Sequence, residues 1–254
     1  MKGGRVIKIG GRPQTDPALP KLVAESWEEN RGTVVLVHGG GDEVSNLQER
    51  MGIRAQFVDG KRVTTAQDLE LVRMALSGTA NKRLVSSLVK EGVRAVGLSG
   101  EDASLIAATP SDSGRMGHVG TPQKINSSIL LHLMDGGYLP VVSPVSRNVG
   151  HELGAALNVN ADDAAAAIAV AIEADELLIV SDVPGVLVDG DAADALTVAE
   201  SRALMQDGRA SGGMRAKLSA AATAVEGGVK RVRISDLSGI TDAHRGTVIQ
   251  RSAE

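Results

Sequence analysis

Short runs of apolar residues recur along the chain, and longer stretches with helical spacing of apolar positions separate them. The runs predict buried strands at residues 6–9, 33–37, 94–98, 139–142, 177–180 and 231–234, with helices between them, such as 16–29 and the stretch from 42 to about 51. Strands that are apolar on both faces and alternate with helices are typical of a mainly parallel sheet covered on both sides. The pattern therefore predicts an α/β fold, a three-layer αβα sandwich around a central, mainly parallel sheet.

Two segments break this pattern. Residues 55–65 and 103–120 are polar and contain glycine, so we expect hairpins or lids there rather than core strands. No repeat, low-complexity run or evident linker divides the rest of the chain. We therefore expect one domain over residues 1–254, in which two lobes share the sheet and meet near residues 150–156.

Composition narrows the classes of function. The 254 residues include one Trp, one Tyr and one Phe, which is too few rings for a surface that stacks on nucleic-acid bases. The net charge is −4 and no long basic run occurs, so we expect no nucleic-acid and no membrane partner. The chain has no cysteine, which excludes disulfides and thiolate metal sites. The first strand starts within a few residues of Met1, leaving no room for a signal peptide, and we expect a soluble, cytoplasmic protein.

Several familiar site patterns are absent from the sequence. The phosphate-binding patterns GxxxxGK[ST] and GxGxxG and the GxSxG nucleophile elbow do not occur. Asp189, Asp191 and Glu200 are spaced as in an EF-hand, but Ala193 cannot bind calcium and Asp194 stands where glycine is required. We expect a surface turn in that segment. The five histidines form no ligand-spaced cluster, and we expect each to be structural or exposed.

Two of the predicted strands end in glycine clusters, Lys8-Ile9-Gly10-Gly11 and His38-Gly39-Gly40-Gly41. Ligands of open α/β sheets bind outside the carboxyl ends of the strands, where glycine lets backbone N–H groups approach an anion. Each cluster alone fits a tight strand-to-helix turn equally well. Lys8 favours a phosphate-binding site, because a lysine within a short apolar strand is costly to bury unless it faces an anion.

Further polar residues lie at the starts of two later predicted helices. Asn160 and Asp162 suit the first turn of a helix. In an extended stretch Asn158 would point to the same side as Asn160, so both amides could reach one ligand. Lys217 lies one turn into the helix that follows Gly212-Gly213-Met214 and points back toward the helix start. A lone lysine on a helix is usually solvated. The position of Lys217 beside a glycine-rich helix start makes a phosphate-binding role a comparable alternative.

Arg62 ends the first expected hairpin and has two interpretations. It fits a surface charge, and it fits bidentate binding of a substrate carboxylate, which arginine performs better than lysine. A site with two lysines, glycine loops and an arginine can bring two anions together. Such chemistry depends mostly on positioning and charge neutralisation.

Taken in order along nearly the whole chain, these segments resemble the amino-acid kinase family, and within it the acetylglutamate kinases. The resemblance also rests on Arg62-Val63-Thr64, Gly78-Thr79-Ala80-Asn81-Lys82, His118-Val119-Gly120, and residues 137–142 and 181–186. It implies transfer of the γ-phosphoryl group of ATP to the γ-carboxylate of N-acetyl-L-glutamate, the second step of arginine biosynthesis, by a homodimer. A kinase for carrier-protein-bound aminoadipate or glutamate is the alternative. Arginine-inhibited members carry an extra N-terminal helix, so we expect an arginine-insensitive enzyme.

The resemblance further implies roles for individual residues. Lys8 and Lys217 would neutralise the phosphoryl group in transfer, and Asp162 would orient both lysines. The phosphoryl group would be bound by Gly10, Gly11 and Gly40. The acylated amino acid would be held by Gly40, Gly41, Arg62 and Asn158, with Asn160 beside them. ATP would be bound by Ser181, Asp182, Val183, Pro184, Gly185, Val186, Leu187, Arg209, Ala210, Ser211, Gly213 and Met214, with Mg²⁺ held mainly by its phosphates and no metal site built from side chains.

The resemblance also divides the chain into two parts. Residues 1–155 would form the lobe for the acylated amino acid and for dimerisation, and residues 156–254 the ATP-binding lobe. One segment departs from the family's pattern: Gly100-Glu101-Asp102-Ala103 stands where the family carries a more glycine-rich Gly-x-Asp-Gly. We therefore expect that loop to sit differently.

Overall fold

The computed structural model describes residues 4–58, 61–111, 116–150 and 155–252. The helices in this part of the chain are α1 (Leu19–Glu29), α2 (Gly41–Arg50), α3 (Ala66–Val72), α4 (Asn81–Lys90), α5 (Ser128–Asp135), α6 (Ala161–Ala171), α7 (Val198–Gln206) and α8 (Gly212–Glu226). The strands are β1 (Arg5–Ile9), β2 (Val34–His38), β3 (Phe57–Val58), β4 (Lys61–Arg62), β5 (Ala95–Gly100), β6 (Ile106–Pro110), β7 (Val119–Ile125), β8 (Leu139–Asn148), β9 (Ala156–Val159), β10 (Glu176–Val180), β11 (Leu187–Val188), β12 (Asp191–Ala192), β13 (Ala195–Thr197), β14 (Arg231–Ser235) and β15 (Thr247–Gln250).

Most of the strands join one sheet in the order β13-β15-β14-β10-β1-β2-β8-β6-β7-β9, and β5 also pairs with β8. Its centre is parallel, because β14, β10, β1, β2, β8 and β5 pair in one direction. The register places Ile9 opposite both Val180 and His38. The carboxyl ends of β10, β1 and β2 therefore lie side by side. A mainly parallel sheet of short apolar strands confirms the predicted fold class.

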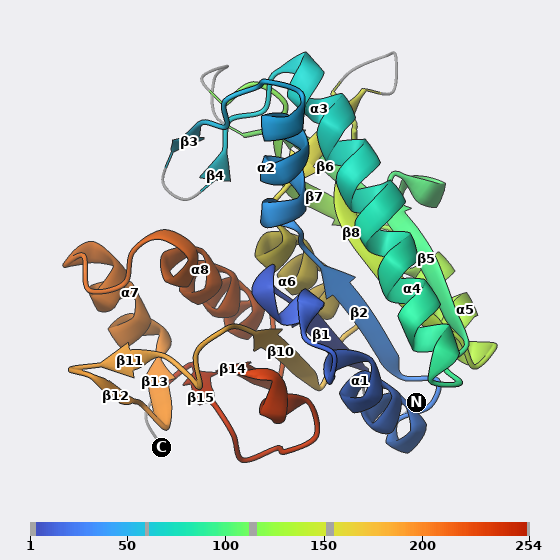
Figure 1. Cartoon of the computed structure of the whole chain (residues 1–254). Coiled ribbons are helices and arrows are strands. Elements are labelled where there is room, and N and C mark those ends of the chain that lie inside the picture. Colours follow the sequence, from blue (N-terminus) through green and yellow to red (C-terminus); the bar gives the residue numbers. More distant parts are fainter. Residues whose placement is uncertain (1–3, 59–60, 112–115, 151–154, 253–254) are drawn as a thin grey trace.

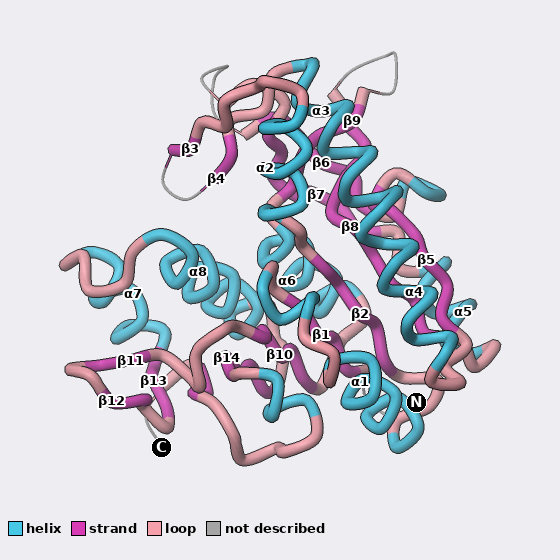
Figure 2. The backbone as a smooth tube through the Cα atoms, in the orientation of Figure 1, coloured by secondary structure: helices cyan, strands magenta, loops and turns pink. Residues whose placement is uncertain are grey.

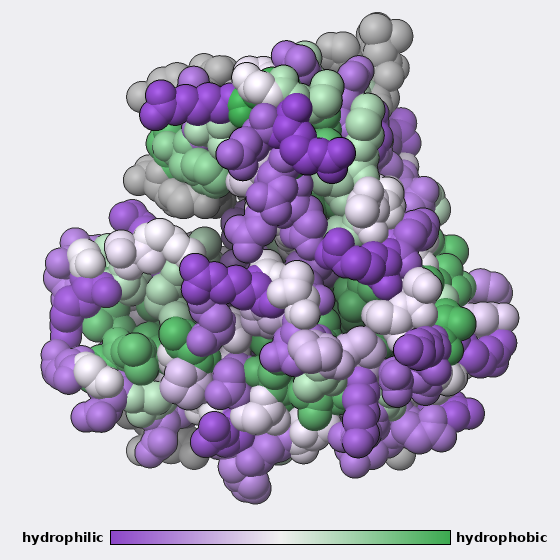
Figure 3. Space-filling model, viewed as in Figure 1, coloured by the Kyte–Doolittle hydropathy of each residue, from purple (hydrophilic) through white to green (hydrophobic). Residues whose placement is uncertain are grey.

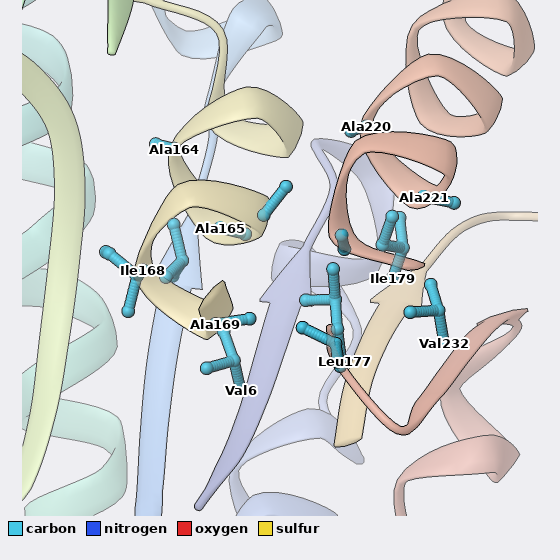
Figure 4. Close-up of a cluster of buried hydrophobic side chains, with 14 of the residues drawn as sticks. Val6, Ala164, Ala165, Ile168, Ala169, Leu177, Ile179, Ala220, Ala221 and Val232 are labelled. Atoms are coloured by element: carbon cyan, nitrogen blue, oxygen red, sulfur yellow. The ribbon is translucent and has the colours of Figure 1, made fainter. Parts of the chain in front are cut away.

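Helices cover both faces of this sheet, which gives the three predicted layers (Figures 1 and 2). On one face, the alanine-rich helices α6 and α8 pack against apolar side chains of β1, β10 and β14 (Figure 4). Alanine carries no bulk beyond Cβ, so the helices approach the strands closely. On the other face α1 and α4 bury Trp27 and Leu88 against Ile7 and Ile9. Successive residues of β1 alternate between the faces, so Lys8 faces α6 and α8.

The hairpin expected at residues 103–120 forms from β6 and β7, but it belongs to the main sheet and is not a separate lid. Its place follows from β8, which runs to Asn148, well beyond the predicted end at residue 142, and pairs there with β6. The apolar pattern also missed β9, β13 and β15, which have only three or four residues each. The expected lobe boundary near residues 150–156 lies partly outside the described residues.

The segment that departs from the family pattern forms a tight turn after β5. Asp102 accepts hydrogen bonds from the backbone N–H and hydroxyl of Ser99 at 2.6 and 3.0 Å. Ala103 adopts φ 50° and ψ 24°, in the left-handed region that glycine enters at no cost. The turn thus takes a glycine-type conformation with an alanine.

The hairpin expected at residues 55–65 forms from β3 and β4, which pair with each other in a small separate sheet. It lies beside α2, and the molecular surface is hollowed between this part and the part that carries α7 and α8 (Figure 3). The acidic segment around Asp189 forms the expected turn, because Asp189 and Gly190 connect β11 and β12. No helix in the described ranges is long and apolar enough to cross a bilayer.

One long helical stretch, formed by α3 and α4 with the residues between them, packs on the sheet near β2 and β8 (Figure 2). Its middle departs from α-helical geometry. Residues Arg73–Ala80 form a π-helical segment between α3 and α4. Such segments are rare and are frequently found at functional sites. The segment packs Ala75 and Leu76 with Val44 of α2 and Val145 of β8.

Candidate functional site

Two glycine loops leave neighbouring strands at the carboxyl edge of the sheet. Gly10 N–H donates to Val180 O at 3.2 Å, and Gly39 N–H donates to Ile9 O at 3.1 Å. These hydrogen bonds hold the loops after β1 and β2 against each other. Gly40 has φ 148°, and a Cβ atom there would lie 2.7 Å from Cδ2 of Leu76. Only glycine fits this position, for both reasons.

Lys8, Asp162 and Lys217 meet beside these loops, in the arrangement that the family resemblance implied. Lys8 Nζ lies 2.7 Å from Asp162 Oδ1, and Lys217 Nζ lies 3.8 Å from Asp162 Oδ2. Lys8 and Asp162 are buried, and Lys217 is partly exposed. Lys217 also points back to its own helix start, with Nζ 3.5 Å from Gly213 O. One carboxylate thus holds two ammonium groups from different elements.

Burial and charge act in opposite directions on Lys8. Desolvation lowers its pKa, the Asp162 carboxylate raises it, and the nearby Lys217 lowers it again, so the pKa lies below the ordinary value of 10.5. The ion pair with Asp162 favours the charged form that desolvation opposes. A second negative charge, from a bound anion, would stabilise both lysines. The arrangement is therefore suited to an anion that arrives between Lys8 and Lys217.

A cavity of about 200 Å³ opens next to this cluster. Its polar lining residues are Lys8, Arg62, Asn158, Asn160 and Asp162, together with Gly11 and residues 39–41. Its apolar lining residues, which form the apolar wall, are Val44, Phe57, Val72, Leu76, Val119, Pro144 and Val159. Pockets with one apolar wall and a few convergent polar groups bind small organic molecules. This cavity fits a small ligand that bears both carboxylate and apolar parts.

Arg62 lies in the cavity wall and is buried, so the surface-charge interpretation is wrong. Its guanidinium donates to Gln48 Oε1, to Ser45 Oγ at 2.8 Å and to Gly41 O at 2.9 Å. The Phe57 ring lies 4.7 Å away on one face. Desolvation lowers the pKa of Arg62, and Asp68 and Asp42 act in the opposite direction, but a guanidinium keeps its charge. α2 and the β3–β4 hairpin thus hold a fixed cation at the cavity.

Asn158 and Asn160 both line the cavity, as their spacing predicted. Asn158 Nδ2 donates to Thr64 Oγ1 at 3.0 Å. Asn160 Oδ1 accepts from the backbone N–H of Asp162 at 2.8 Å and therefore caps α6. The capping interpretation of Asn160 is confirmed, and its Nδ2 group is the part that remains for a ligand.

The residues expected to bind ATP do not line this cavity. Val186 and Ala210 are buried, and Met214 packs against the same apolar core. Arg209 forms an ion pair with Asp207 at 2.7 Å. Ser181 and Asp182 line a separate cavity with Arg12 and Arg245. Two features connect this set to the cluster of Lys8, Asp162 and Lys217. The N-terminal residues of α8, Gly212 and Gly213, lead to Lys217, and Asp182 pairs at 3.1 Å with Arg12, which directly follows the loop of Gly10 and Gly11.

Sequence reasoning missed the residues that hold Arg62 and the apolar wall. Gln48 bridges Arg62 and Asp68, with its Nε2 2.6 Å from Asp68 Oδ1. Asp68 in turn caps α3 through Thr65. Only the Thr65–Asp68 spacing gave a local signal, because it fits a capping box. The contact between Gln48 and Arg62 depends on tertiary structure and has no signature in the sequence.

The carboxylates and histidines of the chain bear on metal binding. Within the ranges that the structure describes, no three or more His, Asp or Glu side chains are placed to hold a metal ion. Asp162 lies inside the cavity wall, but both of its oxygens face lysine ammonium groups. This carboxylate is therefore already neutralised and is poorly suited to bind a divalent cation.

Comparison with known proteins agrees with this geometry. The chain matches the sequence profile of the amino acid kinase family over residues 4–236. The acetylglutamate kinase of Chloroflexus aurantiacus is 43% identical over 239 residues, 93% of each chain. That of Methanopyrus kandleri is 41% identical over 256 residues, 96% of this chain and 99% of the other. The solved structure of smu.665 from Streptococcus mutans matches with a TM-score of 0.89 and 30% identity, over 99% of this chain and 100% of that one. The chain therefore belongs to the amino acid kinase family.

Proposed function

We propose that this protein transfers the γ-phosphoryl group of ATP to the γ-carboxylate of N-acetyl-L-glutamate, giving N-acetylglutamyl 5-phosphate and ADP. The observation that carries the proposal is the Asp162 carboxylate that holds Lys8 and Lys217 beside two glycine loops. The full-length similarity to acetylglutamate kinases at about 40% identity supports the same acceptor.

The reaction requires little from the protein beyond positioning of the two anionic reactants and neutralisation of their charge. An oxygen of the γ-carboxylate forms a bond to the γ-phosphorus of ATP, and the bond from that phosphorus to the β,γ-bridging oxygen breaks, so ADP leaves with the electron pair. The acceptor is already ionised, and no proton needs to be removed. Catalysis then consists of holding two anions in line and neutralising the charge on the transferred group.

The residues of the cluster suit these tasks. Lys8 and Lys217 would contact the phosphoryl oxygens, and Asp162 would keep the two ammonium groups in place. The N–H groups of Gly10, Gly11 and Gly40 would bind the phosphoryl group at the carboxyl edge of the sheet. α2 and α6 begin at this edge, and the positive ends of their dipoles add to the potential for anions.

The cavity would hold the acylated amino acid. Arg62 would bind its α-carboxylate, with Gly41, Asn158 and Asn160 as further polar contacts. The apolar wall that includes Val72 and Val119 would receive the aliphatic and acyl parts. The β3–β4 hairpin lies over this side, and closure of such a hairpin would protect the acyl phosphate from water.

ATP would lie over the carboxyl end of β10 and the start of α8, in contact with residues 181–187 and 209–214. Mg²⁺ would enter with the nucleotide, bound by its phosphates and by water, and would offset the charge of those phosphates. Residues 156–254 then form the ATP-binding lobe, and residues 1–155 form the lobe for the acylated amino acid and for contact with a second copy of the chain.

The acceptor is tested by measuring ADP release with N-acetylglutamate, glutamate, aspartate and N-acetylaminoadipate side by side. We expect N-acetylglutamate to have a kcat/KM at least about tenfold above that of the others, because Arg62, Asn158 and the apolar wall all contribute to its recognition. A tenfold preference for glutamate or aspartate would contradict the proposed acceptor.

The roles of the charged residues are tested by variants. Lys8→Ala is expected to lower kcat by roughly 10²-fold or more, because it removes a charge that faces the phosphoryl group. Arg62→Ala is expected mainly to raise the KM for N-acetylglutamate. Lys21→Ala, an exposed lysine of α1, is the matched control. An unchanged kcat in folded Lys8→Ala would contradict the role of Lys8.

A further inference from the structure

His38 ends β2 directly before the second glycine loop, and its ring is fully buried. Its Nδ1 atom lies 2.8 Å from the carbonyl oxygen of Gly39. Its Nε2 atom lies 3.0 Å from Nδ2 of Asn81, the first residue of α4. The same Nδ2 lies 2.9 Å from Val141 O in β8. A continuous set of contacts therefore joins the middle of the sheet to the loop.

Carbonyl groups at both ends of this set determine where the hydrogens lie. The Val141 carbonyl can only accept, so the Asn81 amide must turn its NH₂ group toward it. That group then also donates to His38 Nε2, which carries no proton. The proton of the neutral ring is on Nδ1 and is donated to the Gly39 oxygen. The reverse amide orientation would place the Asn81 oxygen against Val141 O.

The hydrogen bond to Gly39 fixes the peptide group between Gly39 and Gly40. In a trans peptide, the C=O of one residue and the N–H of the next point in opposite directions. The Gly39 carbonyl points to the buried His38 ring, so the Gly40 N–H points away from it, to the side of the cavity that residues 39–41 line. A peptide between two glycines is otherwise free to flip, because neither residue restricts its dihedral angles.

Packing also restrains this peptide. Leu76, from the π-helical segment, is buried against Gly40. Asn81 follows the C-terminal end of that segment, and Ser77 within it contacts Ser143 of β8 through their hydroxyl oxygens at 2.7 Å. The π-helical segment thus brings both Leu76 and Asn81 to the loop. Packing and hydrogen bonding act on the same peptide group.

We propose that His38 and Asn81 are positioning residues for phosphoryl transfer, and that they lock the Gly39–Gly40 peptide with the Gly40 N–H directed at the transferred group. The role of the N–H group rests on the proposed function. The locked orientation itself rests on the contacts of His38 and Asn81. Neither side chain touches substrate, and both act through the backbone of Gly40.

The locked orientation is tested by the tautomer of His38, which does not depend on the substrate. Long-range ¹H–¹⁵N correlation spectra of ¹⁵N-histidine-labelled protein distinguish the Nδ1–H from the Nε2–H form. We expect His38 in the Nδ1–H form at pH 7, with and without ATP. Assignment uses the His38→Asn variant, whose spectrum lacks the signal. An Nε2–H or doubly protonated ring would overturn the lock.

The catalytic consequence is tested by two substitutions at one position. His38→Leu fills the space but cannot donate, and we expect kcat to fall by roughly 10- to 100-fold, because one N–H group directed at the transition state is released. His38→Asn places an amide nitrogen the same number of bonds from Cα as Nδ1, and we expect a kcat within about fivefold of wild type. The KM for ATP should change by less than about threefold in both variants.

Leu88→Ala is the control for lost stability, because Leu88 is buried in α4 away from the loop. If folded His38→Leu keeps the wild-type kcat, or if His38→Asn is as impaired as His38→Leu, the positioning role is wrong. If the wild-type protein does not phosphorylate N-acetylglutamate, the proposed function fails. The tautomer of His38 then still decides whether the peptide is locked.

Discussion

Burial lowers the pKa of both Lys8 and His38, but it leaves the two side chains in different charge states. Desolvation is the largest influence on both, and it lowers both pKa values. Lys8 has the Asp162 carboxylate as its partner, which supports an ammonium group within the sheet. Among the described residues, the His38 ring has the Gly39 carbonyl and the Asn81 amide as hydrogen-bond partners and no carboxylate, and it stays neutral. The partner, more than the depth of burial, decides which of the two carries charge.

The neutral state of His38 makes stability depend on pH. Burial lowers its pKa from 6.5 to about 4, with Glu43 acting against the shift and Arg83 and Lys82 adding to it. Between these values the unfolded chain binds more protons than the folded one. The contribution is therefore complete above pH 6.5 and is lost as the pH falls toward 4, by about 3 kcal/mol at about 1.4 kcal/mol per pKa unit.

Urea unfolding at pH 7.0 and pH 4.5 measures this contribution. The loss of unfolding free energy between the two pH values should be larger in wild type than in His38→Asn, by roughly 2 kcal/mol. His244→Asn serves as the control, because His244 lies on an exposed turn. The same loss in wild type and His38→Asn would contradict a buried, neutral His38.

Residues of the site differ in how well the sequence predicted them. Lys8 and the glycine clusters were predictable, because each sits at the end of an apolar strand and parallel strands end at one edge. Asn81 was part of a recognised segment, yet its partners His38 and Val141 lie 43 and 60 positions away. No local pattern connects such positions, and the role of Asn81 became visible only in the folded chain.

Three elements of the sheet are held together by one partly buried acidic residue. Glu176 at the start of β10 accepts from Arg5 of β1 at 2.6 Å and from Arg233 of β14 at 2.7 Å. Arg233 is fully buried and also donates to Gly239 O at 3.0 Å. Desolvation raises the pKa of Glu176, but Arg5 and Arg233 outweigh it, so the pKa lies below 4.5.

Glu176→Gln should be strongly destabilising, because it leaves two partly or fully buried guanidinium groups without their carboxylate. We expect a loss of about 3–5 kcal/mol in urea unfolding at pH 7. The contribution of Glu176 is complete above pH 4.5 and is lost as the pH falls through its lowered pKa. The stabilities of wild type and variant should therefore converge in acid.

Glu25→Gln is the control, because Glu25 forms an exposed helical pair with Lys21, and it is expected to change stability by less than about 0.5 kcal/mol. An equally small effect of Glu176→Gln would contradict the argument.

At the scale of elements, long apolar runs were predictable and short strands were not. β13 and β15 hold their places through pairing with neighbours, including the parallel pair that they form together. The π-helical segment was equally invisible, because its sequence fits an ordinary helix and its geometry depends on contacts with β8 and the glycine loop. Tertiary contacts therefore decide both features.

At the scale of the whole molecule, the described residues leave the edge of the main sheet at β5 without a further strand. Among the described residues, β5 pairs only with β8, and Ala95, Val96 and Leu98 are only half-buried. Val89 of the adjacent α4 is 54% exposed, and apolar surface appears along this side in Figure 3. Exposed apolar edge strands invite pairing with another chain unless they are covered. A second copy of the chain is the partner we propose for this side.

Light scattering coupled to size-exclusion chromatography tests this proposal. We expect wild type to elute with twice the monomer mass of 26.2 kDa. Val89→Lys adds a charge at an exposed position of α4, so the fold should persist while the dimer dissociates, because a charge buried at an apolar interface has no partner. Met51, at the end of α2, is 59% exposed, and Met51→Lys is the control that should stay dimeric.

A monomeric wild type would contradict the dimer, whereas a dimeric Val89→Lys would place the contact on another face. Since the proposed reaction centre at Lys8, Asp162 and Lys217 lies on β1, α6 and α8, away from β5, we expect a monomeric Val89→Lys to retain its phosphoryl-transfer activity within about threefold.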